Sequence, residues 1–263
     1  MSVLASKSTF YTTYKTLGLL YLFFIVGLFL DSFYMVKITE NAQFYANSLM
    51  ILIFIITFLK VNNRLKEQML SAVLIGFAGE YLFSILMGMY TYRLGNVPHY
   101  IPFGHAFVYI AVLCFSKAAS IKIHHQFLER FFTIFIFIYA SVFLIFKNDV
   151  FGFVMTIATL LILRNKPKAR LFYLTMYISV AVLEIVGTTY QCWWWPTTAW
   201  DVIPFLPSHN PPSGISFFYF LLDLGTLWLY KQRHKSAWKR MKSIRNIRLQ
   251  SLNIITKKIG NLA

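Results

Sequence analysis

The sequence predicts an all-α polytopic membrane protein, a helical bundle with about eight transmembrane helices. Of its 263 residues, 58% are hydrophobic and 13% are charged, and the mean hydropathy is +0.60. Soluble domains carry about 25% charged and about 45–50% apolar residues. A water-soluble globular enzyme, a disordered tail and a disulfide-stapled secreted module are therefore excluded. The two cysteines, Cys114 and Cys192, indicate neither a disulfide framework nor a cysteine-rich metal site.

Eight apolar runs, each bounded by charged residues, approach the roughly 20 residues that a membrane span needs. The first run is not a cleavable signal peptide, because it is long, carries Asp31 and lacks a small-residue cleavage site. The expected spans are Leu17–Val36, Phe44–Leu59, Gln68–Met89, Ile101–Ser116, Phe131–Phe146, Val150–Leu163, Leu171–Trp193 and Gly214–Tyr230.

The basic residues predict the topology of this bundle. The chain has 25 Lys and Arg against 9 Asp and Glu, a formal net charge of +16. With eight spans, all but Lys37, Arg93 and Lys147 fall on one side of the membrane. Cytoplasmic loops are enriched in Lys and Arg, so both termini are expected in the cytoplasm, with the bundle in the cell's inner membrane. The excess charge thus indicates topology, and no nucleic-acid partner is expected.

Residues 1–230 are expected to form the bundle and residues 231–263 a basic cytoplasmic tail. Apolar residues such as Trp238, Met241 and Ile244 are interspersed among the tail's cations. This pattern favours an amphipathic helix on anionic lipid headgroups. The alternative is an ordinary solvated tail that only fixes the topology.

Two connections on the predicted outer side, 90–104 and 192–213, contain seven of the eight prolines and four of the six tryptophans. They are expected to form stiff aromatic caps. Each follows a span that carries a glutamate, Glu80 or Glu184, and each has an Ile-Pro-Phe sequence before a histidine 25 residues after that glutamate, His105 or His209. This pattern predicts a parallel duplication of a four-span unit, residues 1–130 and 131–230. The alternative is chance similarity, because the motif is short.

Glu80 and Glu184 are the leading catalytic candidates. Each lies about ten residues, hence about 15 Å, from the outer end of its predicted helix, so a position near the bilayer midplane is expected. An acid at that depth is a functional-site hypothesis by default. Apolar surroundings favour the neutral acid, which suits proton donation to a lipophilic substrate. Asp223 is a third candidate. The alternative role for all three is to hold the bundle together through hydrogen bonds.

The predicted substrate pocket takes its aromatic and imidazole side chains from the two connections and the residues next to them. Aromatic faces there would stabilise a developing carbocation. His99, His105 and His209 offer a place for a single divalent metal, but they lack diagnostic spacing, so no metal or other cofactor is expected. The predicted pocket residues are Tyr90, Tyr92, His105, Trp194, Trp195 and His209.

One segment resembles the membrane carotenoid hydratases of the bisanhydrobacterioruberin hydratase type. Those proteins are multi-span and of similar size, with a membrane glutamate followed by G-x-Y-x-Y and V-P…I-P motifs. The resemblance implies water addition across a terminal isoprenoid double bond, with an acid that protonates the alkene. It covers residues 79–102, and His105 stands where an aromatic residue is expected. The matching residues are Gly79-Glu80, Gly88, Tyr90, Tyr92, Val97-Pro98 and Ile101-Pro102.

The leading hypothesis is therefore a membrane enzyme, a lyase or hydratase, that acts on an isoprenoid or carotenoid-like lipid. Its expected partners are that lipophilic molecule and the anionic headgroups beneath the tail. A proton-coupled transporter and a non-catalytic subunit of a membrane complex are the alternatives. The sequence leaves open whether Glu80 and Glu184 share one site.

Overall fold

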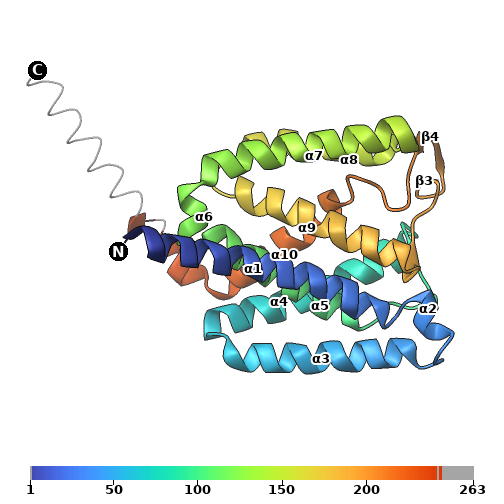
Figure 1. Cartoon of the computed structure of the whole chain (residues 1–263), viewed down its shortest axis with the longest axis horizontal. Coiled ribbons are helices and arrows are strands. Elements are labelled where there is room, and N and C mark those ends of the chain that lie inside the picture. Colours follow the sequence, from blue (N-terminus) through green and yellow to red (C-terminus); the bar gives the residue numbers. More distant parts are fainter. Residues whose placement is uncertain (1, 242, 245–263) are drawn as a thin grey trace, which may run out of the picture.

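A computed structural model describes residues 2–241 and 243–244 and confirms the all-α polytopic bundle (Figure 1). Among the described residues, six helical segments are long and apolar enough to cross a membrane. They are α1 (Ser2–Phe29) with the short α2 (Phe33–Val36), α3 (Ala42–Lys60), α4 (Asn63–Glu80) with the π-helix η1 (Tyr81–Leu86), α5 (Tyr100–Lys117), α7 (His125–Lys147) and α9 (Arg170–Thr189).

Two further helices lie where the sixth and eighth spans are predicted. The apolar helix α8 (Val150–Arg164) is shorter than the six, and α10 (Ser216–Arg233) includes Asp223 and two basic residues. A five-residue helix, α6 (Ala119–Ile123), joins α5 to α7. The chain is also helical over 235–241, and residues 242 and 245–263 of the predicted tail lie outside the described residues.

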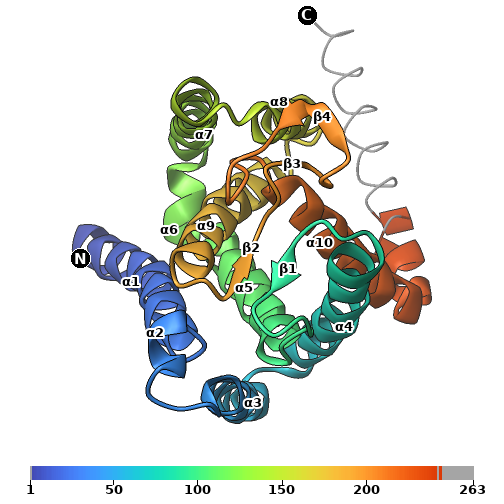
Figure 2. The same cartoon turned by 90° about the vertical axis from the view of Figure 1, so that its right-hand side faces the viewer.

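Four helices form the centre of the bundle. Helix α4 packs against α5 and α10, and α9 packs against the same two helices from the other side. In the end-on view of Figure 2, α1 and α3 lie beside α5, while α7 and α8 lie beside α9 and α10.

The outer surface of the bundle is apolar. On α7, Ile134, Phe135 and Ile138 are all exposed, and α3 exposes Leu52 and Ile55. Apolar patches of this kind are rare on water-soluble monomers. They are the surface that a helix presents to lipid hydrocarbon, which agrees with an integral membrane protein.

Short strands cover one end of the bundle, called the cap end below. Strand β1 (Thr91–Tyr92) pairs antiparallel with β2 (Trp193–Trp194), and β3 (Thr198–Ala199) pairs with β4 (Ile203–Pro207). The predicted seventh span is too long at this end, because α9 stops at Thr189 and Trp193 lies in a strand. Gln191 has φ of +57°, a left-handed conformation that ends the helix.

Two buried aspartates fasten the caps to the helices. The Asp31 carboxylate, just after α1, pairs with the Arg93 guanidinium and accepts a hydrogen bond from the Tyr100 hydroxyl at 2.8 Å. Asp31, a residue with no exposed surface, therefore has a bracing role. The Asp149 carboxylate, just after α7, accepts hydrogen bonds from the backbone N–H groups of Gly152, His209 and Ser213.

The two halves of the chain have the same order of central elements. In each half, a helix with a glutamate (α4 or α9) leads to a short strand (β1 or β2) and then to a second central helix (α5 or α10). The two strands pair antiparallel, as a two-fold axis along the bundle would require. The duplication of residues 1–130 and 131–230 stays a prediction, with this arrangement as its main support.

Candidate active site

Side chains from the cap segments reach the two glutamates. Glu80 is the last residue of α4, and the six-residue η1 follows it. Glu184 lies five residues before the end of α9, about 7.5 Å along the axis at about 1.5 Å per residue. The predicted depth of about ten residues is therefore too large for both acids. The helical segments end before the predicted span ends, at Leu86 and Thr189, and extended cap segments follow them.

Three side chains from the first half surround the Glu80 carboxyl, which is 3% exposed. The hydroxyls of Tyr90 and Tyr92 both donate to Oε2 at 2.5 Å. The Nε2 atom of His105 lies 2.7 Å from Oε1. Burial, and then the charge of Glu80, raise the pKa of both phenols well above the ordinary value of about 10. Both tyrosines therefore remain hydrogen-bond donors at any working pH.

The Glu184 carboxyl, also 3% exposed, has a matching set of donors from the second half. The indole Nε1 atoms of Trp193 and Trp195 donate to Oε2 at 2.8 and 3.0 Å. The hydroxyl of Tyr219, on α10, donates to Oε1 at 2.9 Å. Indole N–H groups can only donate, so Glu184 is the acceptor in both tryptophan contacts.

The two carboxyl groups belong to one site. The Tyr90 ring lies 4.5 Å from the Trp195 ring, and the His105 ring lies 4.9 Å from the Tyr219 ring, measured between centroids. Both glutamates line the same cavity of about 20 Å³. A water molecule needs about 10–15 Å³, so this cavity has room for about one. In the described structure, Glu80 and Glu184 are therefore neighbours across one cavity.

Of the predicted pocket residues, Tyr90, Tyr92, His105 and Trp195 line this cavity. Trp194 does not, and its side chain is 44% exposed. Side chains alternate between the two faces of an extended strand, so Trp193 and Trp195 face the site while Trp194 faces out. Trp193 is thus a site residue that the sequence reasoning missed, although this alternation is a signal that would have found it.

Two other predicted site residues lie elsewhere. The Nδ1 atom of His209 is 3.1 Å from the carbonyl oxygen of Pro211, and its ring packs against Phe143. Asp223 lines a different cavity, toward the opposite end of the bundle.

The counterpart of His105 is Tyr219, which follows Glu184 by 35 residues. The second connection is longer than the first, and His209, 25 residues after Glu184, contacts Pro211 and Phe143 instead of Glu184.

The three histidines considered as metal ligands do not converge in the described structure. His105 contacts Glu80, His209 contacts Pro211, and the His99 ring packs against Phe77. Among the described residues, no group of three or more His, Cys, Asp or Glu side chains is placed to hold a metal ion.

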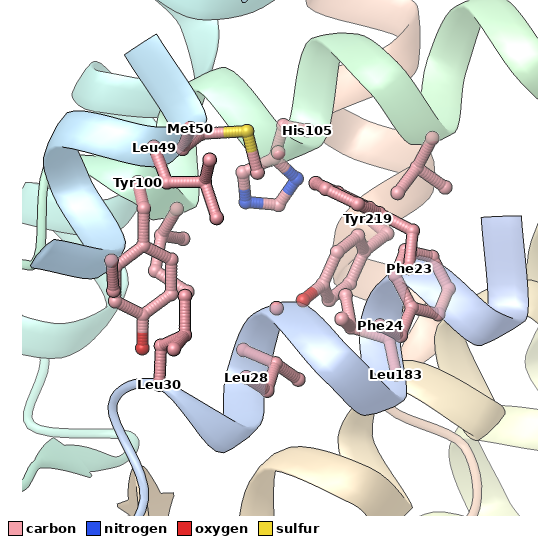
Figure 3. Close-up of a pocket in the computed structure, with 15 residues that line it drawn as sticks. Phe23, Phe24, Leu28, Leu30, Leu49, Met50, Tyr100, His105, Leu183 and Tyr219 are labelled. Carbon is pink, nitrogen blue, oxygen red and sulfur yellow. The ribbon is translucent and has the colours of Figure 1, made fainter. Parts of the chain in front are cut away.

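A second pocket, called the apolar pocket below, has His105 and Tyr219 in its wall (Figure 3). It has a volume of about 50 Å³ and lies between α1, α3 and α5. Leu49, on α3, lines it and is 39% exposed on the outer face of the bundle. His105 and Tyr219 line both this pocket and the cavity between the glutamates. The other lining residues include Phe23, Phe24, Leu28 and Met50.

The apolar pocket and the cavity between the two carboxyl groups are therefore adjacent, with His105 and Tyr219 in the wall of both. Comparisons with known proteins find no matching family model, no matching curated protein and no matching solved structure.

Proposed function

We propose that the protein is a membrane enzyme that acts on a lipophilic, isoprenoid-like substrate by acid–base chemistry at Glu80, His105 and Glu184. One observation carries the proposal: the apolar pocket ends at His105, whose imidazole contacts a buried carboxyl group. A positioned imidazole–carboxyl pair is suited to move a proton to or from a substrate. The apolar walls suit a hydrocarbon chain that arrives from the bilayer.

The reaction that fits this arrangement is the addition of water to a carbon–carbon double bond. His105, oriented by Glu80, gives a proton to one alkene carbon, and the π electrons form the new C–H bond. The neighbouring carbon becomes a carbocation, which the aromatic ring of Tyr219, in the wall of both the apolar pocket and the cavity, stabilises. Water attacks this carbon and gives up a proton to Glu184. Tyr219 keeps Glu184 oriented through its hydrogen bond. After the product leaves, Glu184 releases its proton to water and His105 takes one up from water, which restores both groups.

The resemblance of residues 79–102 to the membrane carotenoid hydratases supports the same class of reaction. The glutamate and both tyrosines of the resembling segment come together in one hydrogen-bonded group, although ten and twelve residues separate them. The glutamate and tyrosines of this sequence pattern therefore also lie together in space. The substrate class remains part of the proposal.

A proton-coupled transporter is the second candidate. Asp223 lines a cavity at the end of the bundle opposite the caps, so buried carboxyl groups occur at two depths. Such a series of acids is typical of proton pathways in transporters. The two candidates differ in a measurable product: an enzyme changes its lipophilic ligand chemically, whereas a transporter moves it.

The deciding experiment begins with protein purified together with native lipid, from which co-purifying small molecules are identified by mass spectrometry. Conversion of that molecule is then measured for Glu80→Gln and Glu184→Gln. The matched control is Glu40→Gln, which makes the same change at an exposed position. We expect conversion to stop in both site variants and to continue in the control. Normal conversion in both site variants would overturn the proposal, as would proton-coupled uptake of the unchanged molecule into proteoliposomes.

A further inference from the structure

A large cavity lies at the opposite end of the bundle, called the basic end below. Its volume is about 460 Å³, and it lies where α4 begins and α5 ends. Four cationic side chains line it, and they come from four separate segments of the chain: Arg64, Lys117, Lys122 and Lys168. The enrichment of basic residues on one side of a membrane protein explains their presence at this end. It does not explain why they converge on one cavity.

These cations have no acidic partner among the described residues. The ammonium group of Lys117 is within electrostatic reach of Arg64 and Lys122, which repel it. The nearby acids are already engaged: Glu67 contacts His234, and Glu129 lies within ion-pair distance of His125 and Arg170. Such a cluster favours an anionic ligand, because the ligand's charge would offset the repulsion.

Deeper in the same cavity, two hydrogen-bond acceptors lack partners. Asp223 Oδ2 and Gln68 Oε1 have no hydrogen-bond partner in the described structure, and their residues are only 8% and 2% exposed. Buried polar atoms are nearly always hydrogen-bonded in native proteins. A ligand with an N–H or O–H donor would satisfy both atoms, and both belong to residues that line the cavity.

Most of the remaining wall is aliphatic or aromatic and includes Phe172, Leu227 and Trp238, while Ser116, His125 and three tyrosines add polar groups to it. Tryptophan is enriched where a membrane protein meets the lipid headgroups. The cavity therefore combines a basic rim, deep acceptors and apolar walls, which together match an amphiphile with a phosphate.

We propose that this cavity binds a phospholipid headgroup. Its phosphate contacts Lys117, Lys122 and the other rim cations, and its amine or hydroxyl group donates to Asp223 and Gln68. A soluble phosphate ester with the same donor shares this chemistry, but the apolar walls favour the lipid. This site is separate from the glutamate pair, and it does not depend on the activity proposed above.

The test measures lipid binding to the full-length protein in detergent by native mass spectrometry. Phosphatidylethanolamine and phosphatidylcholine are the probes, because they share a phosphate and a net charge but only the former has N–H donors. We expect phosphatidylethanolamine to bind about tenfold more tightly, a difference of the size that one or two hydrogen bonds provide. Asp223→Ala should abolish this preference, and Gln68→Ala should reduce it. Equal binding of the two lipids by the wild-type protein would overturn the proposal.

Charge variants test the basic rim separately. The Lys117→Gln/Lys122→Gln double variant should bind phosphatidylethanolamine about tenfold more weakly, because each cation near a phosphate contributes measurably to binding. The control Lys60→Gln/Lys166→Gln removes two exposed lysines outside this cavity and should bind normally. An equal loss in both double variants would indicate general attraction and overturn the proposal. Displacement of the lipid by phosphoethanolamine at a similar concentration would identify a soluble ligand and overturn the lipid assignment.

Discussion

Two tyrosine hydroxyls share a single oxygen of Glu80, each at 2.5 Å. Hydrogen bonds to a charged group are shorter and stronger than those between neutral groups. The pair therefore fixes the orientation of the carboxyl group and leaves Oε1 for His105. At this scale, the site is a set of rigid donors around each acid.

Removal of one of these donors is a direct test of their contribution. Tyr92→Phe keeps the ring but loses the hydroxyl, which should destabilise the fold by about 1–3 kcal/mol. A lower melting temperature in detergent, recorded by circular dichroism, is the expected result. Tyr190→Phe, a change near the same end of the bundle that removes no hydrogen bond described above, serves as the control. Identical melting temperatures for the two variants would contradict the role given to Tyr92.

A second prediction concerns Cys192, which has no exposed surface. Burial raises the pKa of its thiol well above the ordinary value. Because only the thiolate reacts readily, and a raised pKa keeps the thiol protonated until higher pH, the folded protein should resist alkylation at pH 8. Mass spectrometry of a Cys114→Ser variant treated with iodoacetamide, before and after denaturation, checks this. Rapid labelling of the native protein would show that the thiol is accessible.

At the scale of the elements, the strands β1 and β2 depend on close packing against the helices. A Cβ atom on Gly187, in α9, would collide with the indole of Trp193. Glycine at this position therefore lets the β2 strand approach closely enough for Trp193 to reach Glu184.

Gly187→Ala should consequently displace Trp193 and weaken the second donor set. We expect a lower melting temperature and a shift in tryptophan fluorescence. Gly18→Ala provides the control, since a Cβ at Gly18, in α1, meets no atom within 4 Å. That change should leave stability unchanged or raise it by up to about 1 kcal/mol, because alanine favours helix. If Gly187→Ala behaved like the control, the close approach would have no structural importance.

The helices could be predicted from the sequence, and their outer ends could not. Apolar runs of span length are visible directly, so all eight helices lie near their expected positions. The place where α9 stops depends on the left-handed backbone at Gln191 and on the return of the chain toward Glu184. That return follows from tertiary contacts. The contact between Tyr219 and Glu184 could not be predicted for the same reason, because it depends on how α10 packs beside α9.

At the scale of the whole molecule, the orientation of the bundle in the membrane is still a prediction. The basic end carries the loops that hold Lys60, Lys122 and Lys166, and cytoplasmic loops are enriched in such residues. A reporter that is active only in the cytoplasm, inserted after Lys166, should therefore be active. The same reporter inserted after Asn148, near the cap end, should be silent. The reverse pattern would place the caps in the cytoplasm.

The pairing of β1 with β2 joins the donors of one glutamate to those of the other, since Tyr92 lies opposite Trp193 in the register. A shift of either strand that moved Tyr92 away from Glu80 would also pull Trp193 from Glu184. The two acids are therefore linked mechanically and gain or lose their donors in concert. A movement that separated the paired strands β1 and β2 from the helices would therefore expose both carboxyl groups to water at the same time.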